Sequence, residues 1–115
     1  MPSIKQYSNE TDLKDHVRDA IKKKYGRNAW FYKTHDMCRV GIPDIFLVFY
    51  GWGVGIELKM PGEKLKPIQS YNLKLIREAG GHGFGACSVD EVIKKLDLIL
   101  VEASNEGPDD FDYPE

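Results

Sequence analysis

Residues 41–60, GIPDIFLVFYGWGVGIELKM, decide the fold that this 115-residue sequence predicts. Two runs rich in β-branched and aromatic residues, 42–50 and 54–60, flank the segment Gly51-Trp52-Gly53. A glycine-rich segment between two such runs favours a tight turn, so we predict a hairpin of two strands. Both runs are apolar on nearly every position, which is typical of strands at the centre of a sheet.

The sequence on either side of the hairpin predicts further helices and strands from its apolar spacing, capping residues and glycines. The expected elements are, in order, a helix from Ser8 or Asn9 to Gly26, a strand at 29–33, the hairpin, a helix at 67–79, a strand at 82–87 and a helix that a capping box opens at 88–91. A helix between the third and fourth strands implies a crossover and a parallel pair. We therefore predict an α/β fold of order αβββαβα, with a mixed sheet of about four strands flanked by helices.

Composition places the chain among single-domain globular proteins, with residues 1–102 as the domain. Residues 103–115 are polar and acidic, and we expect a flexible tail there. Six of the 18 acidic residues fall at 102–115, so the rest of the chain has 16 basic against 12 acidic residues. This balance suits an anionic partner, but it equally suits an ordinary solvated surface. Without a transmembrane run or signal peptide, we expect a cytoplasmic location.

Three charged residues lie within the apolar hairpin, where charge is costly unless it is compensated. Glu57 and Lys59 are two residues apart on one strand, so their side chains share a face. Asp44 begins the neighbouring strand and is expected to reach Glu57 across the hairpin. Two carboxylates with water suit Mg²⁺ or Mn²⁺, and such an ion can activate water for phosphodiester hydrolysis. Lys59 would orient or activate that water, or hold the phosphate. The alternative is a cross-strand charge cluster on a surface hairpin.

Glu10 is a candidate third metal ligand, because it shares the inward face of the first predicted helix with Leu13 and Val17. The alternative is a first-turn glutamate that the helix dipole favours. Cys38 and Cys87 are far apart in the chain and have no companion at zinc-ligand spacing, so a zinc site is not expected.

The segments Gly41-Ile-Pro-Asp44, Ile56-Glu57-Leu58-Lys59 and Lys66-Pro67-Ile68-Gln69 closely resemble the VRR-Nuc family, the virus-type replication-repair nucleases of the PD-(D/E)xK restriction-endonuclease-like superfamily. The resemblance spans residues 9–96. It implies metal binding by Glu10, Asp44, Glu57 and the main-chain carbonyl of Leu58. It also implies catalytic roles for Lys59 and Gln69.

The same resemblance implies a stand-alone, phage-type nuclease that acts as a homodimer on branched DNA such as Holliday junctions. Two symmetric nicks in a four-way junction suit two active sites related by a two-fold axis. Phe49, Tyr50 and Trp52 cluster at the predicted hairpin tip, as candidates either for an interface or for the core.

Several basic residues are candidates for DNA contact through phosphates, each with an ordinary solvated surface position as its alternative. They are Lys22, Lys23, Lys64, Lys66 and Arg39. His35 and Cys38 lie in the loop before the Gly-x-Pro-Asp segment, and we expect neither to be catalytic. Met60 and the aromatic residues 30–32 are expected in the core.

The charged residues predict a Mg²⁺- or Mn²⁺-dependent nuclease with no organic cofactor and no membrane partner, and the resemblance implies a deoxyribonuclease that cuts branched DNA. Two alternatives remain open. One is a nuclease of the same fold that acts on flap, linear or other DNA. The other is a non-catalytic nucleic-acid-binding module.

Overall fold

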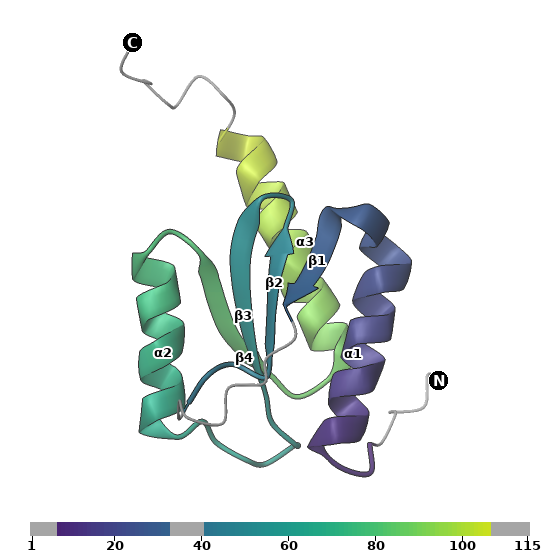
Figure 1. The fold of residues 1–115 in the computed structure, drawn as a ribbon, viewed down its shortest axis with the longest axis vertical. Helices are drawn as coiled ribbons and strands as arrows, with labels where there is room; N and C mark the ends of the chain where they lie inside the picture. Colours follow the sequence, from purple (N-terminus) through teal and green to yellow (C-terminus); the bar gives the residue numbers. More distant parts are fainter. Residues whose placement is uncertain (1–6, 33–40, 107–115) are drawn as a thin grey trace.

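The computed structural model describes residues 7–32 and 41–106. Its elements are, in chain order, α1 (Glu10–Tyr25), a short 3-10 helix η1 (Gly26–Asn28), β1 (Ala29–Tyr32), β2 (Ile45–Phe49), β3 (Trp52–Leu58), α2 (Pro67–Glu78), β4 (His82–Ala86) and α3 (Val89–Glu106). One four-stranded sheet stands between α1 and α3 on one face and α2 on the other (Figure 1). The predicted α/β class and element order are confirmed.

The strands follow one another in the order β1-β2-β3-β4. The first two pairings are antiparallel, and Ile45 faces Ile56 in the second of them. β3 and β4 are parallel, with α2 as the crossover between them. The sheet is therefore mixed, as the helix between the third and fourth strands predicts.

The hairpin turn consists of Tyr50 and Gly51, because Phe49 already pairs with Trp52. Both turn residues have positive φ angles, 49° and 87°, which is typical of a type I′ hairpin turn. The predicted turn at 51–53 is therefore displaced by one residue, and Trp52 belongs to the strand. β2 also starts later than predicted, at Ile45, since the preceding Pro43 has no N–H to donate to a ladder.

The hydrophobic core lies between the sheet and the pair α1 and α3. Alternate residues of β2 and β3 point into it, as the two-residue period of a strand requires. Its buried members are Leu13, Val17, Ile21, Tyr25, Ile45, Leu47, Phe49, Val54, Ile56, Leu58, Ala86, Val92, Leu96 and Ile99. Phe49 is thus a core residue, which removes it from the candidate interface at the hairpin tip.

The opposite face of β3 and β4 is shaped for close approach by α2. A Cβ atom on Gly83 would lie 2.6 Å from the main-chain oxygen of Leu73, and one on Gly55 would lie 2.6 Å from Cδ1 of Ile76. Real side chains cannot come this close, so these glycines set how near the helix lies to the strands. This packing fixes the start of α2 relative to the end of β3.

β1 is an edge strand, and two of its aromatic residues lie outside the core. Trp30 is 62% exposed and Tyr32 is 54% exposed, so the prediction of a buried aromatic strand is wrong for both. They lie on the face of the sheet that bears α2, but α2 packs on β3 and β4 and leaves β1 uncovered. Met60 is half-buried rather than part of the core.

The C-terminal end of α1 is tied to α3 by a polar cluster. The Tyr25 hydroxyl donates to Oδ1 of Asp97 over 2.7 Å, and Lys24 Nζ donates to Oδ2 of the same carboxylate over 2.6 Å. Burial, followed by the bond to Asp97, raises the pKa of Tyr25. The Lys24 ammonium and the Tyr25 hydroxyl in turn lower the pKa of Asp97.

α3 continues to Glu106, past residue 102 where we place the end of the domain. The remainder of the predicted tail, 107–115, lies outside the described residues. Within the described part of the chain, none of the helices has both the length and the apolar character to cross a bilayer.

Candidate active site

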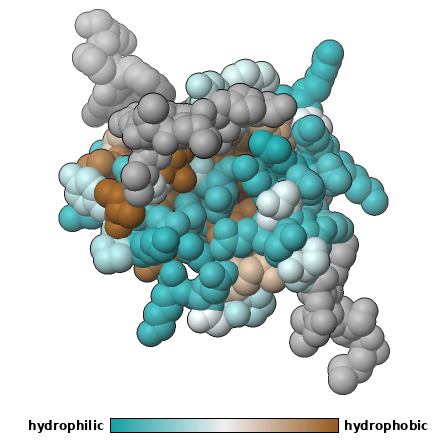
Figure 2. Space-filling view, turned by 60° about the horizontal axis from the view of Figure 1, so that its bottom comes forward, coloured by the Kyte–Doolittle hydropathy of each residue, from teal (hydrophilic) through white to brown (hydrophobic). Residues whose placement is uncertain are grey.

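Four element ends meet at one end of the molecule. The starts of α1, β2 and α2 and the end of β3 all lie at the bottom of Figure 1. Figure 2 turns this end toward the reader, and most of its surface is hydrophilic, with a hydrophobic area at one side. The residues that the sequence singles out for chemistry belong to these four ends.

Asp44 and Glu57 lie side by side. The pairing of Ile45 with Ile56 places the preceding Asp44 opposite the following Glu57, so both side chains leave the same face of the sheet. Asp44 Oδ2 also accepts the Leu58 N–H over 2.8 Å. The predicted reach of the Asp44 carboxylate across the hairpin is therefore present in the structure.

Glu57 is a buried carboxyl group, with 3% of its surface exposed. Burial is the largest cause that raises its pKa, to about 8, and the neighbouring charge of Asp44 is the second. Lys59 acts in the opposite direction. Oε2 of Glu57 is shielded from solvent and has no hydrogen-bond partner among the described residues. Such an atom is costly to bury unless something binds it.

Gln69 holds the other oxygen of Glu57. Its Nε2 donates to Oε1 of Glu57 over 2.9 Å. Its own Oε1 accepts the main-chain N–H of Lys66, three residues earlier, over 2.8 Å. The amide therefore joins the first turn of α2 to the active-site strand, and this fixes which oxygen of Glu57 stays available.

Lys59 follows directly after β3. Its main-chain N–H donates to the carbonyl of Ala86 over 3.0 Å, which continues the ladder with β4 beyond the last strand residue. Its positive charge lowers the pKa of both Glu57 and Glu10. The Lys59 ammonium thus stabilises the charged form of Glu57 on β3 and of Glu10 on α1.

Glu10 approaches the same site from the first turn of α1. Asn9 caps this helix by accepting the Asp12 N–H over 2.8 Å, as the sequence predicts. The pKa of Glu10 is raised, first by burial and then by the charge of Asp44. Within residues 7–32 and 41–106, however, no three His, Cys, Asp or Glu side chains converge into a metal-binding group. A ligand role for Glu10 stays a prediction.

Glu63 is a further acidic residue of this site that the sequence patterns did not single out. Its side chain contributes a hydrogen bond and a charge that raise the pKa of Glu10. Its Oε1 also accepts the Met60 N–H over 2.8 Å, which closes the turn after β3. The only sequence signal was an acid directly after the Pro61-Gly62 turn.

The conformation and the close contacts of Gly41 explain why the Gly-x-Pro-Asp segment begins with glycine. Its φ angle of 82° lies in the left-handed region that favours glycine. A Cβ atom on Gly41 would lie 2.7 Å from Nδ2 of Asn72 on α2. The Asn72 Nδ2 donates to the Gly41 carbonyl over 3.0 Å. The contact fastens the chain to α2 three residues before Asp44.

The donor set fits a hard divalent cation. Two adjacent carboxylates, one with a buried oxygen that has no partner, offer the anionic oxygen ligands that Mg²⁺ and Mn²⁺ prefer. A nearby ammonium and a glutamine bonded to one carboxylate complete the arrangement. Chemically, this set can bind a cation and orient a phosphate ester.

Comparison with solved structures gives a match described as "VRR_NUC domain". It has a TM-score of 0.59 and 22% sequence identity, and it covers 74% of this chain and 95% of the matched chain. The chain has the VRR_NUC fold. No protein-family model and no curated protein matches the sequence. The fold that the Gly-x-Pro-Asp and Glu-x-Lys segments imply is therefore confirmed.

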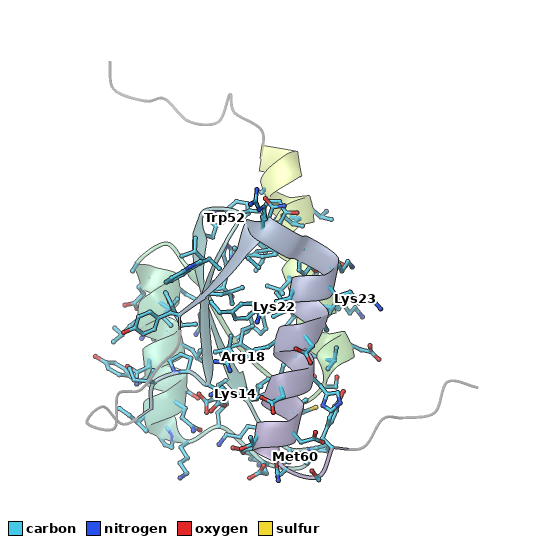
Figure 3. The ribbon with its side chains drawn as sticks, turned by 45° about the vertical axis from the view of Figure 1, so that its right-hand side comes forward. Lys14, Arg18, Lys22, Lys23, Trp52 and Met60 are labelled. Atoms are coloured by element: carbon cyan, nitrogen blue, oxygen red, sulfur yellow. The ribbon has the colours of Figure 1, made fainter. Side chains whose placement is uncertain are left out.

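The candidate DNA contacts are spread around the VRR_NUC fold. Lys64 and Lys66 are exposed on the segment that leaves the active-site strand. Lys22 and Lys23 project to opposite sides of α1 (Figure 3), and Lys22 Nζ lies 5.7 Å from the ring centre of Phe31. Arg39 lies outside the described residues, as do His35 and Cys38.

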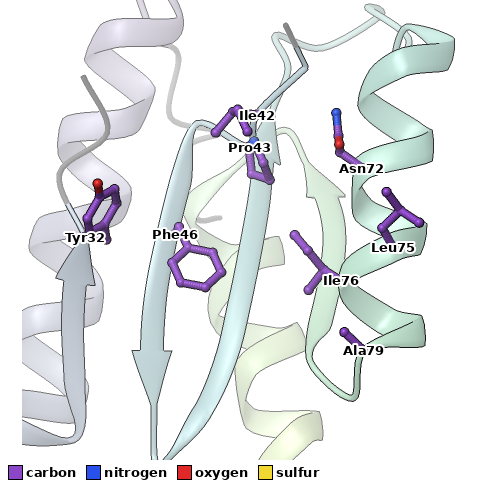
Figure 4. Close-up of a pocket in the computed structure, with 8 residues that line it drawn as sticks. All are labelled: Tyr32, Ile42, Pro43, Phe46, Asn72, Leu75, Ile76 and Ala79. Carbon is purple, nitrogen blue, oxygen red and sulfur yellow. The ribbon is translucent and has the colours of Figure 1, made fainter. Parts of the chain in front are cut away.

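A separate groove lies between the uncovered part of the sheet and α2, with a volume of about 490 Å³ (Figure 4). Its lining is almost entirely apolar and consists of Tyr32, Ile42, Pro43, Phe46, Asn72, Leu75, Ile76 and Ala79. Among the described residues, its lining offers no carboxylate, imidazole or thiol, whereas the acidic end brings two carboxylates together. In this VRR_NUC fold the acidic end is the candidate active site.

Proposed function

We propose that the chain is a metal-dependent deoxyribonuclease that hydrolyses phosphodiester bonds. The observation that carries this proposal is the buried Glu57 carboxyl group beside Asp44, with one oxygen that lacks a partner among the described residues. A folded protein gains nothing from such a pair by itself, since burial and the adjacent charge of Asp44 both disfavour the charged form of Glu57. A bound cation compensates it.

Asp44 and Glu57 would hold Mg²⁺ or Mn²⁺, and Glu10 and the Leu58 carbonyl are the candidates for further ligands. Bound there, the ion would lower the pKa of a coordinated water and offset the negative charge that develops on the phosphate. The acceptor role of Asp44 toward the Leu58 N–H orients its carboxylate for this task.

The side chains around the acidic pair have separate roles. Lys59 orients the attacking water or holds the scissile phosphate, because an ammonium is a compact charge with three donors. Gln69 is a positioning residue, since it keeps one oxygen of Glu57 occupied and leaves the other available. The surface at this end is mostly hydrophilic (Figure 2), and the exposed Lys64 and Lys66 follow the active-site strand, which supports the approach of a polyanion.

For the substrate we propose branched DNA such as a Holliday junction, cut by a homodimer. Paired nicks in a four-way junction suit two sites related by a two-fold axis. Exposed apolar side chains on β1 and β2 support self-association, because monomers seldom leave a large apolar patch uncovered. Trp30, Tyr32 and Val48 are exposed together on the sheet face that α2 leaves open.

A panel of labelled DNA substrates of equal length tests this proposal: a four-way junction, a flap and a linear duplex. We expect the junction to be cut fastest, no product in EDTA, and recovery with Mg²⁺ or Mn²⁺. Sedimentation of the wild type and of Trp30→Glu measures dimerisation in parallel. The variant should be monomeric and should resolve junctions poorly.

Each other outcome points to a different conclusion. Equal rates on all three substrates would retain a nuclease and reject selectivity for branches. Binding to DNA without cleavage under any divalent metal would reject the enzyme and leave a binding module.

A further inference from the structure

Three basic residues on α1 continue a row that starts in the candidate active site. Glu10, Lys14, Arg18 and Lys22 are spaced by four residues, so they form one ridge along the helix surface. Each step advances about 6 Å along the helix axis. Figure 3 shows the three basic side chains in this order, on the flank of α1 that faces the sheet.

The cations of this row form no ion pair with another residue that the structure describes. The ion pairs recorded for residues 7–32 and 41–106 involve His16, Lys24, Lys74 and Lys95. Lys24, next to the row, is engaged with Asp97. The cation that acts on Glu10 is Lys59 rather than Lys14, although Lys14 is one turn away. The row therefore keeps its positive charge available.

Arg18 provides a second, independent observation. Its Nε is shielded from solvent and has no hydrogen-bond partner among the described residues. An unsatisfied buried donor is costly, and a guanidinium is suited to bind phosphate oxygens. Lys22 lies over the ring of Phe31, which holds its ammonium beside β1. Arg18 is half-buried and Lys22 is exposed, so a ligand in solvent can reach both side chains.

We propose that Lys14, Arg18 and Lys22 form a phosphate track, which binds the backbone of a DNA duplex arm that extends from the cleaved bond along α1. The proposal rests on the nuclease function proposed above. Because the row begins at Glu10, a strand that lies on it passes directly into the acidic pair. The track binds backbone and not bases, so it contributes affinity and register without sequence preference.

The test measures binding of a fluorescein-labelled DNA duplex by anisotropy in EDTA, where no cleavage is expected. Lys14→Ala/Lys22→Ala is compared with the matched control Lys74→Ala/Lys94→Ala, which removes two lysines from α2 and α3. We expect affinity to fall about tenfold or more, and the slope of log affinity against log salt to fall by about 2. The control should keep the slope of the wild type. Arg18→Ala should also weaken binding, and Arg18→Lys should weaken it less.

Thermal unfolding followed by circular dichroism verifies that each variant is folded. If the double variant does not fold, Lys22→Ala alone gives the same test with an expected slope change of about 1. If the double variant binds with the affinity and slope of the wild type while metal-dependent cleavage proceeds, the track is wrong and the nuclease proposal stands. If the wild type neither binds nor cuts DNA, both proposals are wrong.

Discussion

Gln69 on α2 donates a 2.9 Å hydrogen bond to Glu57 on β3, and it accepts one from the main-chain N–H of Lys66, the N-cap of its own helix. The amide is therefore held at both ends. This bond constrains the orientation of the Glu57 carboxyl group, which the strand alone does not determine.

Replacing Gln69 by Ala should weaken metal use without loss of DNA binding. Residues that orient a ligand through a hydrogen bond typically contribute about 10- to 100-fold in metal affinity or activity. We expect the Mg²⁺ concentration for half-maximal cleavage to rise by a factor in that range. Ser70→Ala, an exposed change on the same turn, is the control and should behave as the wild type. An unchanged metal titration would assign Gln69 only to helix capping.

Asp44→Asn separates the charge of Asp44 from its structural bond. Asparagine retains an oxygen that accepts the Leu58 N–H, so the fold should be preserved. Loss of the anionic ligand should cost several kcal/mol of transition-state stabilisation, which is a fall in cleavage rate of ~10³-fold or more. Single-turnover cleavage and DNA binding are the measurements. Cleavage at the wild-type rate would remove Asp44 from the active site.

The raised pKa of Glu57 predicts a pH-dependent stability of the metal-free protein. The folded-state pKa, about 8, lies above the ordinary value of 4.5, so the folded state binds the proton more tightly than the unfolded state. This contribution is complete below pH 4.5 and is lost as pH rises through 8. We expect the melting temperature in EDTA to fall over this range more steeply for the wild type than for Glu57→Gln.

Magnesium should counteract this loss, because the bound ion favours the ionised carboxylate. The shift in melting temperature produced by Mg²⁺ should therefore be larger at pH 8.5 than at pH 6, since binding at low pH must displace a proton. A shift that is independent of pH, or that persists in Glu57→Gln, would contradict a metal site at this residue.

Gly41→Ala and Gly62→Ala form a matched pair, since both glycines have φ angles near 80–90°. Around Gly62 nothing lies within 4 Å of an added Cβ, so only backbone strain of about 1 to 2 kcal/mol is expected. At Gly41 the Cβ would also collide with Asn72 and Ile68, and the total should reach about 2 to 4 kcal/mol. Chemical denaturation measures both. Equal losses of unfolding free energy in the two variants would show that α2 moves away from an added Cβ at no energetic cost.

The order of the elements and the acidic pair were predictable, because both depend on local patterns. Strand alternation alone places Glu57 and Lys59 on one face, and hairpin pairing brings Asp44 beside them. The turn was displaced by one residue because glycines occur at both 51 and 53, and only the pairing of Phe49 with Trp52 selects between them.

Features that depend on which helix covers which strand were not predictable from local patterns. Trp30 and Tyr32 were expected in the core because aromatic strands are usually buried, but α2 leaves β1 open. Glu63 enters the site through its contact with Glu10, which is more than fifty residues away in the chain. Lys14 and Arg18 are candidates for DNA contact only because the row that they form on α1 starts at Glu10, and local sequence patterns leave open whether Glu10 lies in the acidic site.

The two ends of α1 lie in two different polar clusters. Glu10 belongs to the acidic site, whereas Tyr25, fifteen residues later and about 23 Å along the axis, is anchored to Asp97 of α3. Leu13, Val17 and Ile21 pack into the core between these two ends, so α1 holds Glu10 and Tyr25 at a fixed distance and rotation. A single residue inserted in α1 would turn Glu10 by about 100° relative to Tyr25 and carry it out of the acidic site.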